Sequence, residues 1–555
     1  MRNLYLLSKK DFVLTSLRLL LRAACAMLFC AMVCPLQSWA QWIQQQELTA
    51  SDGITDAGFG YSVAISEDGS TMVIGAGGAL VGSNTEQGKA YVFVKSGASW
   101  TQQAELTSSD GAAYDNFGGA VAISGSTIVV GAKCAGPRAS GFSGCAGPGT
   151  AYVFVQNSGV WTQHAELTAS DGEAFDLFGS SVAISGGTIV VGAPGHLAVS
   201  NANSGSVVYG KGAAYVFAQT GGLWAQQAEL TAVDGVASDN FGGSVAISGS
   251  TIVVGASSHP KPANNVGAGP GAAYVFTQTG TTWTQQAELT ASDGAAGDDF
   301  GFSVAVSGGS VVVGALYHGD QGAAYVFTQG GGPWTQQAEL TASDGAAGDE
   351  FGGPVAIAGN TMVIGAASHT VGSNVHQGAA YVFTQKGMTW AQQAELTASD
   401  GVAGDLFGTS AAVSGSTIVA GAPRKTIGSN MFQGAAYVFA PPPVVTFSGS
   451  PQQPLTTDGS GNYMAQVTIT NTGNVTVSSL QLTSATLGSG SLLTTPAAIT
   501  NLRAGQSAVV TLTFPPSSVP TGATRAALKM NGTYLVTSAS LSGNWALSFR
   551  SVNVR

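Results

Sequence analysis

A self-similar unit, repeated seven times between Trp42 and Phe439, constrains the fold of this chain more than any other feature. Its clearest copy, at residues 283–327, reads WTQQAELTASDGAAGDDFGFSVAVSGGSVVVGA, then a variable stretch, then GAAYVF. One Phe-Gly pair marks each copy, and the phenylalanines of these pairs are Phe59, Phe117, Phe178, Phe241, Phe300, Phe351 and Phe407. Repetition at this spacing predicts an array of similar supersecondary units instead of a series of unrelated domains.

Each copy contains four strand-like runs of the types SVAIS, TIVVGA, AAYVF and WTQQAELTA, separated by Gly, Ser and Asp turn signals. The turn between the first two runs is short enough for a tight hairpin. The composition agrees, because 78 glycines and only 9% charged residues are typical of β-rich repeats and not of helical bundles. Four strands in each of seven copies predict a seven-bladed β-propeller over residues 42–440.

The two ends of the array predict that the propeller closes on itself. The first copy begins with an isolated fourth strand at residues 42–50, and the last copy ends with its third strand at Tyr437, Val438 and Phe439. We therefore expect residues 42–50 to form the outermost strand of the seventh blade. Such pairing leaves few exposed sheet edges.

The recurring Phe-Gly, Gly-Ala and Tyr-Val-Phe segments, with Pro194 and Pro423 after two of the Gly-Ala pairs, resemble the FG-GAP repeat. This repeat is known from integrin α-chain propellers and from many bacterial secreted proteins. The resemblance implies a seven-bladed propeller that serves as a binding platform. Integrin-type repeats that hold calcium carry an Asp-x-Asp-x-Asp-Gly-like loop between the first two strands, whereas the acids of that turn here are Glu67 and Asp68 alone. Because calcium takes six to eight oxygen ligands, we expect none there.

The segments outside the array predict export and a second domain. Residues 1–40 have a basic start, an apolar run of 14 residues and the small-residue site Ser38-Trp39-Ala40, which together indicate a signal peptide cleaved after Ala40. The alternative, a membrane anchor, needs about 20 apolar residues, so we expect no transmembrane anchor in the mature chain. A Pro linker at 441–443 precedes residues 444–555, whose strand-like runs predict an immunoglobulin-like β-sandwich acting as a spacer or adhesive unit.

The charge balance limits the partners of the chain. It has 19 basic and 30 acidic residues, a net charge of −11, and removal of residues 1–40 changes this charge to −15. No basic stretch is present that could neutralise a run of phosphates, so no nucleic-acid partner is expected.

Two cysteines remain after cleavage, Cys134 and Cys145, both in one loop of the second copy. An oxidising destination favours a disulfide between them. A metal site on this loop would need histidine or further cysteine nearby, and the loop has neither.

A periodic cation lies four positions after the glycine of the Gly-Ala pair. The residues at this position in blades 3 to 7 are His196, His259, His318, His369 and Lys425. They should lie on the same face of the propeller as the aspartates that recur in the inter-blade loops. Successive strands run in opposite directions, so the loop before the first strand and the loop after the second strand emerge at the same end of the blade. Descent from a common repeat explains the pattern without function; a pH-sensitive polar rim that faces a partner is the functional alternative. A metal shared between blades is not expected, since packed sheets stand ~10 Å apart and metal ligands lie ~2 Å from their ion.

Catalytic patterns are absent from the sequence. It has no Gly-x-Ser-x-Gly, His-Glu-x-x-His or Cys-x-x-Cys segment. The repetition of the carboxylates favours a structural role. In a glycosidase pair the environment must make the pKa of one carboxyl group differ from that of the other, which identical copies do not suggest. We therefore expect no catalytic residues, no metal and no cofactor.

The longest variable loops predict a recognition surface. They have 16, 18 and 14 residues and fall on the consecutive blades 2, 3 and 4, and function tends to reside on loops held by a rigid scaffold. The expected protein is an exported, non-catalytic binding or adhesion protein, secreted or at the cell surface, that engages an extracellular protein or glycan. The alternatives are a secreted carbohydrate-active enzyme or its accessory lectin domain, and an architectural envelope component.

Overall fold

The computed structural model describes residues 42–97, 99–136, 147–197, 199–201, 206–259, 269–537 and 541–554. The predicted signal peptide, residues 1–40, and Cys145 of the predicted disulfide lie outside these ranges. The described part is all-β, and its one helical element is the short 3-10 helix η1 (Pro516–Ser518). Within these ranges, no helix has the length and apolar character needed to cross a membrane.

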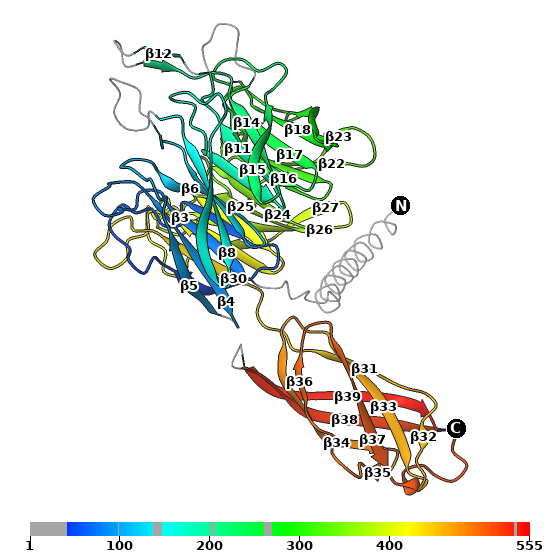
Figure 1. The fold of residues 1–555 in the computed structure, drawn as a ribbon. Helices are drawn as coiled ribbons and strands as arrows, with labels where there is room; N and C mark the ends of the chain where they lie inside the picture. The colour runs from blue at the N-terminus through cyan, green and yellow to red at the C-terminus, as the bar shows by residue number, and fades with distance from the viewer. Residues whose placement is uncertain are drawn as a thin grey trace, which may run out of the picture. The chain divides into compact units, whose positions relative to one another are not determined.

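Seven antiparallel sheets of four strands each follow one another along the chain (Figure 1). The strands of the first four sheets are β2 (Ser62–Ile65), β3 (Thr71–Ala76), β4 (Lys89–Ser96), β5 (Ser99–Leu106); β6 (Phe117–Ser124), β7 (Thr127–Ala132), β8 (Thr150–Asn157), β9 (Val160–Leu167); β10 (Ser181–Ser185), β11 (Thr188–Ala193), β14 (Ala213–Thr220), β15 (Leu223–Leu230); and β16 (Phe241–Ser248), β17 (Thr251–Ala256), β18 (Ala272–Thr279), β19 (Thr282–Leu289). A separate two-stranded hairpin, β12 (Val199–Asn201) and β13 (Ser206–Val208), lies in the loop between β11 and β14.

The strands of the last three sheets are β20 (Phe300–Ser307), β21 (Ser310–Ala315), β22 (Ala323–Gln329), β23 (Trp334–Leu340); β24 (Phe351–Ala358), β25 (Thr361–Ala366), β26 (Ala379–Lys386), β27 (Thr389–Leu396); and β28 (Ser410–Ser414), β29 (Thr417–Ala422), β30 (Ala435–Ala440), β1 (Ile43–Leu48). The seventh sheet thus combines the two ends of the array. Its register pairs Ile43 with Ala440 and Glu47 with Tyr437.

The seven sheets form a closed ring. The first strand of each sheet contacts the first strand of the next, and β28 of the seventh sheet contacts β2 of the first. This arrangement is consistent with a seven-bladed β-propeller, and we call each four-stranded sheet a blade, numbered in chain order. At the seam of the ring, β1 pairs with β30 and makes the seventh blade four-stranded like the others.

The hydrophobic core lies between neighbouring blades. In blade 4 the second strand is almost completely buried and the third is buried over residues 272–276, whereas the fourth strand alternates between exposed and less exposed residues because it is the outermost. In blade 4, Phe241 of the Phe-Gly pair packs on Tyr274 and Phe276 with ring centroids 5.5 and 6.2 Å apart. The core cluster of this blade also includes Val190 and Val216 of blade 3.

Two glycines of the repeat allow neighbouring blades to approach closely. A Cβ atom on Gly255, in the Gly-Ala pair of blade 4, would lie 2.0 Å from the carbonyl oxygen of Gly301 in blade 5. Gly301 belongs to the next Phe-Gly pair and has a φ of +92°, a conformation that favours glycine. The hydroxyl of Ser244 donates to the same carbonyl oxygen at 2.8 Å. At the seam of the ring, Ser410 makes the equivalent bond to Gly60.

The C-terminal region contains two further antiparallel sheets. One consists of β31 (Phe447–Pro451), β33 (Tyr463–Asn471), β32 (Thr456–Thr457) and β37 (Ser507–Phe514); the other consists of β34 (Val477–Leu487), β35 (Gly490–Ser491), β36 (Ile499–Leu502), β38 (Arg525–Val536) and β39 (Leu541–Asn553). Both sheets contribute to one core that includes Val467, Leu512, Met530 and Trp545. The immunoglobulin-like assignment of this region stays a prediction.

Candidate functional site

A polar cluster lies where two loops of blade 3 meet. The loop that precedes β10 carries Asp171 and Asp176, and the loop that follows β11 carries His196. These loops are joined by a backbone hydrogen bond from Gly195 to Asp176 at 3.0 Å. Because the side chains of both loops are in contact, the expectation that the histidines and the inter-blade aspartates share one face is confirmed.

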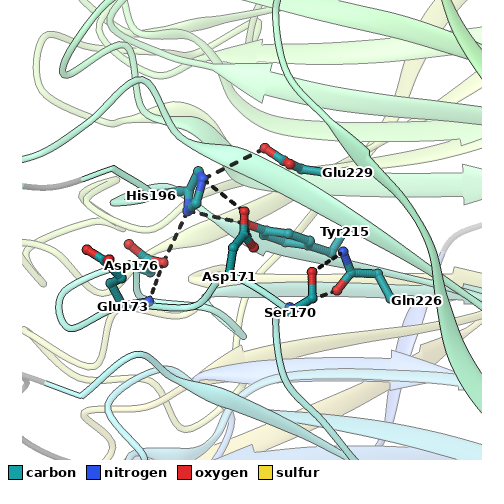
Figure 2. A network of polar contacts seen from close by, with 8 residues as sticks. All are labelled: Ser170, Asp171, Glu173, Asp176, His196, Tyr215, Gln226 and Glu229. Carbon is teal, nitrogen blue, oxygen red and sulfur yellow. Dashed lines mark hydrogen bonds and ion pairs between the residues drawn. The ribbon is translucent and has the colours of Figure 1, made fainter.

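His196 lies between carboxylates on both sides of its ring (Figure 2). Its Nδ1 is 3.1 Å from Asp176 Oδ2, and its Nε2 is 3.7 Å both from Asp171 Oδ2 and from Glu229 Oε1, which comes from β15. Tyr215 of β14 donates a hydrogen bond to Asp171 at 3.0 Å. The His196 side chain is buried, whereas those of Asp171 and Glu229 are partly open to solvent.

The same arrangement recurs in blades 4, 5 and 6. The histidine Nδ1 lies 2.7, 2.8 and 2.7 Å from a carboxylate oxygen of an inter-blade aspartate, in the pairs His259–Asp239, His318–Asp298 and His369–Asp349. The Nε2 atom faces a second Asp and a Glu of the fourth strand, in the sets Asp234, His259, Glu288; Asp293, His318, Glu339; and Asp344, His369, Glu395. We call each His with its facing Asp and Glu a blade cluster.

Lysine takes the place of histidine in two other blades. In blade 7, Lys425 Nζ lies 3.1 Å from Asp400 Oδ2 and 3.3 Å from Asp405 Oδ2. In blade 1 the histidine position is Ala79, and Lys89 at the start of β4 pairs instead with Asp52 and with Glu105, at 2.7 Å from Glu105 Oε1. A positively charged or ionisable nitrogen therefore lies beside the aspartate of the Asp-Gly turn in six blades.

The buried aspartate also holds its own loop in place. Asp239 accepts a hydrogen bond from the backbone N–H of Val236 at 2.6 Å as well as facing His259. In the same way, Asp176 accepts a hydrogen bond from the backbone N–H of Glu173, and Asp405 accepts one from that of Val402. The structural duty expected for the repeated aspartates, which is to cap loop amides, is therefore observed.

The electrostatics of the clusters follow from these contacts. The hydrogen bond to Asp176 raises the pKa of His196 above its ordinary value, against the effect of burial. Burial alone would lower the pKa of His259, but the hydrogen bond to Asp239 and the nearby carboxylates raise it overall. Burial and the charge of Asp234 raise the pKa of Glu288. The clusters of blades 3 and 4 are therefore places where a cation is favoured.

The histidines and Lys425 are mostly buried, which bears on the alternative of a polar rim that faces a partner. His196, His259 and His369 are only 3, 4 and 7% exposed, and Lys425 is buried as well. Their side chains turn inward because each one faces the buried inter-blade aspartate of its blade. His318, the fourth histidine, is less buried than the others but makes the same contacts. Their role as ligand-binding residues stays a prediction.

The glutamate of the fourth strand is the member of the cluster that was not singled out from the sequence. It occurs in every QQAEL or QQQEL strand and therefore reads as part of the repeat. The antiparallel register of β14 and β15 shows why this glutamate belongs to the cluster. Glu229 lies opposite Tyr215 in the register, near the loop that bears His196.

Cys134 is buried at the start of the long loop of blade 2. Its proposed partner, Cys145, lies outside the described residues, so the disulfide stays a prediction.

A cavity of about 320 Å³ lies at the junction of blades 3 and 4, on the face that bears the variable loops. Four loops contribute its lining residues, which are Leu177, Pro194, Gly195, Tyr209, Ser238, Asn240 and Ser258. Tyr209 and the neighbouring Leu197 are exposed apolar side chains at this place. The cavity is large enough for a small ligand or for one anchoring side chain of a larger partner.

A closed ring of seven similar sheets with loops gathered on one face defines a repeat protein of the β-propeller class. The family model described as FG-GAP repeat matches residues 42–93, 100–154, 161–217, 224–276, 283–327, 334–383 and 390–439. The chain belongs to the FG-GAP repeat family. A comparison with curated proteins finds no match. FG-GAP repeats occur in extracellular proteins and are often found in binding and adhesion proteins.

Proposed function

We propose that this protein is an exported, non-catalytic binding protein that engages an extracellular protein or glycan through its propeller loops. The frequent occurrence of FG-GAP repeats in binding and adhesion proteins supports this proposal. The secretory character of residues 1–40 supports export.

The observation that carries the proposal is the cavity between blades 3 and 4. It combines apolar surface from Leu177 and Tyr209 with polar groups from Ser238 and Asn240. Such a mixture is typical of binding sites, where apolar groups supply contact area and a few polar groups supply specificity. Tyr209 is 43% exposed and offers a rigid amphipathic ring of the kind enriched at interfaces.

The repetition of the blade clusters supports a non-catalytic role. Acid–base catalysis by paired carboxylates needs two groups whose environments push their pKa values apart. Here four clusters have the same residue types in similar geometry, with His Nε2 facing Asp and Glu in each. Fourfold similarity favours a duty that every blade performs.

The remaining parts of the proposal concern the scaffold. The C-terminal region, with two antiparallel sheets around one core, is proposed to be an immunoglobulin-like spacer or adhesive module. A disulfide between Cys134 and Cys145 is proposed to pin the long loop of blade 2, which would contribute up to ~3 kcal/mol on the chain-entropy model.

Screening residues 41–555 against a glycan array and a library of extracellular proteins tests the proposal. A retained ligand should lose about tenfold or more in affinity with Tyr209→Ala, as expected for an interface tyrosine. Leu223→Ala is the matched control, because Leu223 is an exposed apolar residue of the same blade at the first position of β15, at the other end of the strands from the cavity. Release of glycan hydrolysis products, or binding that Tyr209→Ala leaves unchanged, would contradict the proposal.

A further inference from the structure

We propose that blades 3 to 6 each bind one divalent transition-metal ion, of which Zn²⁺ is the best fit, through the histidine Nε2 and the two facing carboxylates. The four ligand sets are Asp171, His196, Glu229; Asp234, His259, Glu288; Asp293, His318, Glu339; and Asp344, His369, Glu395. This inference does not depend on the proposed binding function. It also differs from a metal shared between blades, because every ligand set comes from within one blade.

The distances between Nε2 and the two facing carboxylates are longer than hydrogen bonds and close to the separations between the ligands of one metal ion. In blade 4, Nε2 of His259 lies 3.4 Å from Asp234 Oδ2 and 3.9 Å from Glu288 Oε1. An N–H···O hydrogen bond is shorter, at about 2.7–3.2 Å. Two ligands of a tetrahedral ion, each about 2.0–2.2 Å from it, lie roughly 3.3–3.6 Å apart, so the 3.4 Å separation falls in this range and the 3.9 Å separation is somewhat longer. In each set the three ligand atoms lie within 4.8 Å of one another.

The other face of each ring is held as it is in metal-binding histidines. Nδ1 of His259 lies 2.7 Å from Asp239 Oδ2, and Asp239 is itself fixed by the N–H of Val236. In the neutral imidazole the proton belongs on Nδ1, because the carboxylate can only accept a hydrogen bond here, and the lone pair of Nε2 then points toward Asp234 and Glu288. A carboxylate behind a ligating histidine orients the ring and increases its basicity.

In blades 1 and 7 a lysine ammonium lies beside the corresponding carboxylates. In blade 7 the ammonium of Lys425 lies 3.1 Å from Asp400 Oδ2, and in blade 1 that of Lys89 lies 2.7 Å from Glu105 Oε1. There the protein supplies a positive charge directly to the aspartate of the Asp-Gly turn, and in blade 1 also to the glutamate of the fourth strand. The imidazole of blades 3 to 6 is shorter than lysine, and in blade 4 it stops 3.4–3.9 Å from the same oxygens. We infer that a bound metal ion supplies the corresponding charge in those four blades.

The ligand chemistry selects among ions. One imidazole nitrogen and two carboxylate oxygens suit Zn²⁺, which is commonly bound by three protein ligands with a fourth position open to water. Calcium prefers six to eight oxygen ligands, which a cluster cannot provide. Access is not blocked, because the side chains of Asp234 and Glu288 are 48 and 37% exposed while His259 is buried.

Metal titration of the untagged chain tests the inference. Residues 41–555 are purified without a polyhistidine tag, treated with EDTA, dialysed and titrated with ZnCl₂ in a calorimeter, and the metal content is measured by mass spectrometry. We expect four saturable zinc sites per chain and no comparable uptake of Ca²⁺. Co²⁺ in place of Zn²⁺ should give visible absorption bands typical of tetrahedral coordination.

One conservative substitution assigns the sites. Glu288→Gln keeps the size of the side chain but removes a charged ligand, so the zinc stoichiometry should fall from four to three. Glu47→Gln is the matched control, since Glu47 holds the equivalent register position in blade 7, where Lys425 is present. Asp234→Asn provides a second variant of the same cluster, and circular dichroism establishes that each variant is folded.

Four results would overturn the inference. The first three are a lack of saturable zinc uptake, a zinc stoichiometry that Glu288→Gln and Asp234→Asn both leave at its original value, and an equal loss with the Glu47→Gln control. His164 and His376 lie outside the clusters, so a stoichiometry that falls only with His164→Gln or His376→Gln would equally count against it.

Discussion

At the scale of single residues, the buried inter-blade aspartate holds together the two loops that carry the blade cluster. Asp239 is fully buried, caps the N–H of Val236 and faces Nδ1 of His259. A buried carboxylate is costly unless it is paired and hydrogen-bonded. The histidine therefore has a structural duty toward one aspartate, whatever its other nitrogen binds.

Replacement of this aspartate should destabilise the protein. Asp239→Ala leaves the N–H groups of Val236 and His259 without their acceptor, and an unsatisfied buried donor costs about 1–3 kcal/mol. The free energy of unfolding, measured by urea denaturation after EDTA treatment, should fall by about that amount.

The double variant Asp239→Ala/His259→Ala is the informative control. It reproduces the residues of blade 1, which has Ala57 and Ala79 at these two positions, both buried. Because both partners are removed together, the double variant should lose less stability than the sum of the two single variants, with a coupling of about 0.5–3 kcal/mol. Strictly additive losses would show that the pair does not interact.

At the scale of elements, the spacing between blades is set by glycine. The second strand of each blade passes against the Phe-Gly turn of the next, and the backbone atoms are too close for a Cβ atom between them. This contact explains why the Gly-Ala and Phe-Gly pairs repeat together. The glycine of the Gly-Ala pair in one blade packs against the Phe-Gly pair of the next blade.

Gly255→Ala should therefore be strongly destabilising. Its Cβ atom would lie 2.0 Å from the Gly301 carbonyl oxygen, so β17 and β20 would have to separate. Overpacking of a core typically costs about 1–3 kcal/mol and occasionally more. Differential scanning calorimetry should show a clearly lower Tm.

Gly187→Ala is the matched control for this substitution. Gly187 lies in the hairpin turn between β10 and β11 and does not have a positive φ, and a Cβ atom added to it would meet no other atom within 4 Å. Its replacement should change the free energy of unfolding by no more than about 0.5–1 kcal/mol. Equal effects of the two substitutions would rule out the close approach as the reason for the glycine.

At the scale of the whole molecule, the ring is closed by strand β1. Its residue Leu48 is buried in the core cluster shared by blades 7 and 1, and Gln44 accepts a hydrogen bond from the N–H of Ser399 at 2.9 Å. Without β1 the last blade has three strands, and β30 becomes an exposed edge. Exposed edges favour association between chains.

A chain that begins at residue 51 should be less stable than one that begins at residue 42. Loss of the buried Leu48 side chain alone is expected to cost about 2–5 kcal/mol, and the freed edge of β30 should promote aggregation. Calorimetry and size-exclusion chromatography of the two chains provide the measurement. A synthetic peptide of residues 42–50 added in trans should restore the Tm, and identical behaviour of the two chains would contradict closure by β1.

Local patterns were sufficient for much of the fold. The runs SVAIS, TIVVGA and AAYVF predicted strands in every copy, and the orphan runs at 42–50 and 437–439 lie paired in one sheet. The hairpin of β12 and β13 was not anticipated, because its residues form no repeat. The first strand of blade 4 also begins earlier than expected, at Phe241, with a register shift before Ser244 that depends on the neighbouring strand.

The sequence by itself determined the repeated strands, their number and the family, because side-chain alternation and turn residues act over a few positions. Only the tertiary structure decided which polar groups meet. Asp171, His196 and Glu229 are far apart along the chain, and strand register and loop packing bring them together. Burial was likewise a tertiary outcome, since whether a histidine faces solvent or a carboxylate depends on the path of a neighbouring loop.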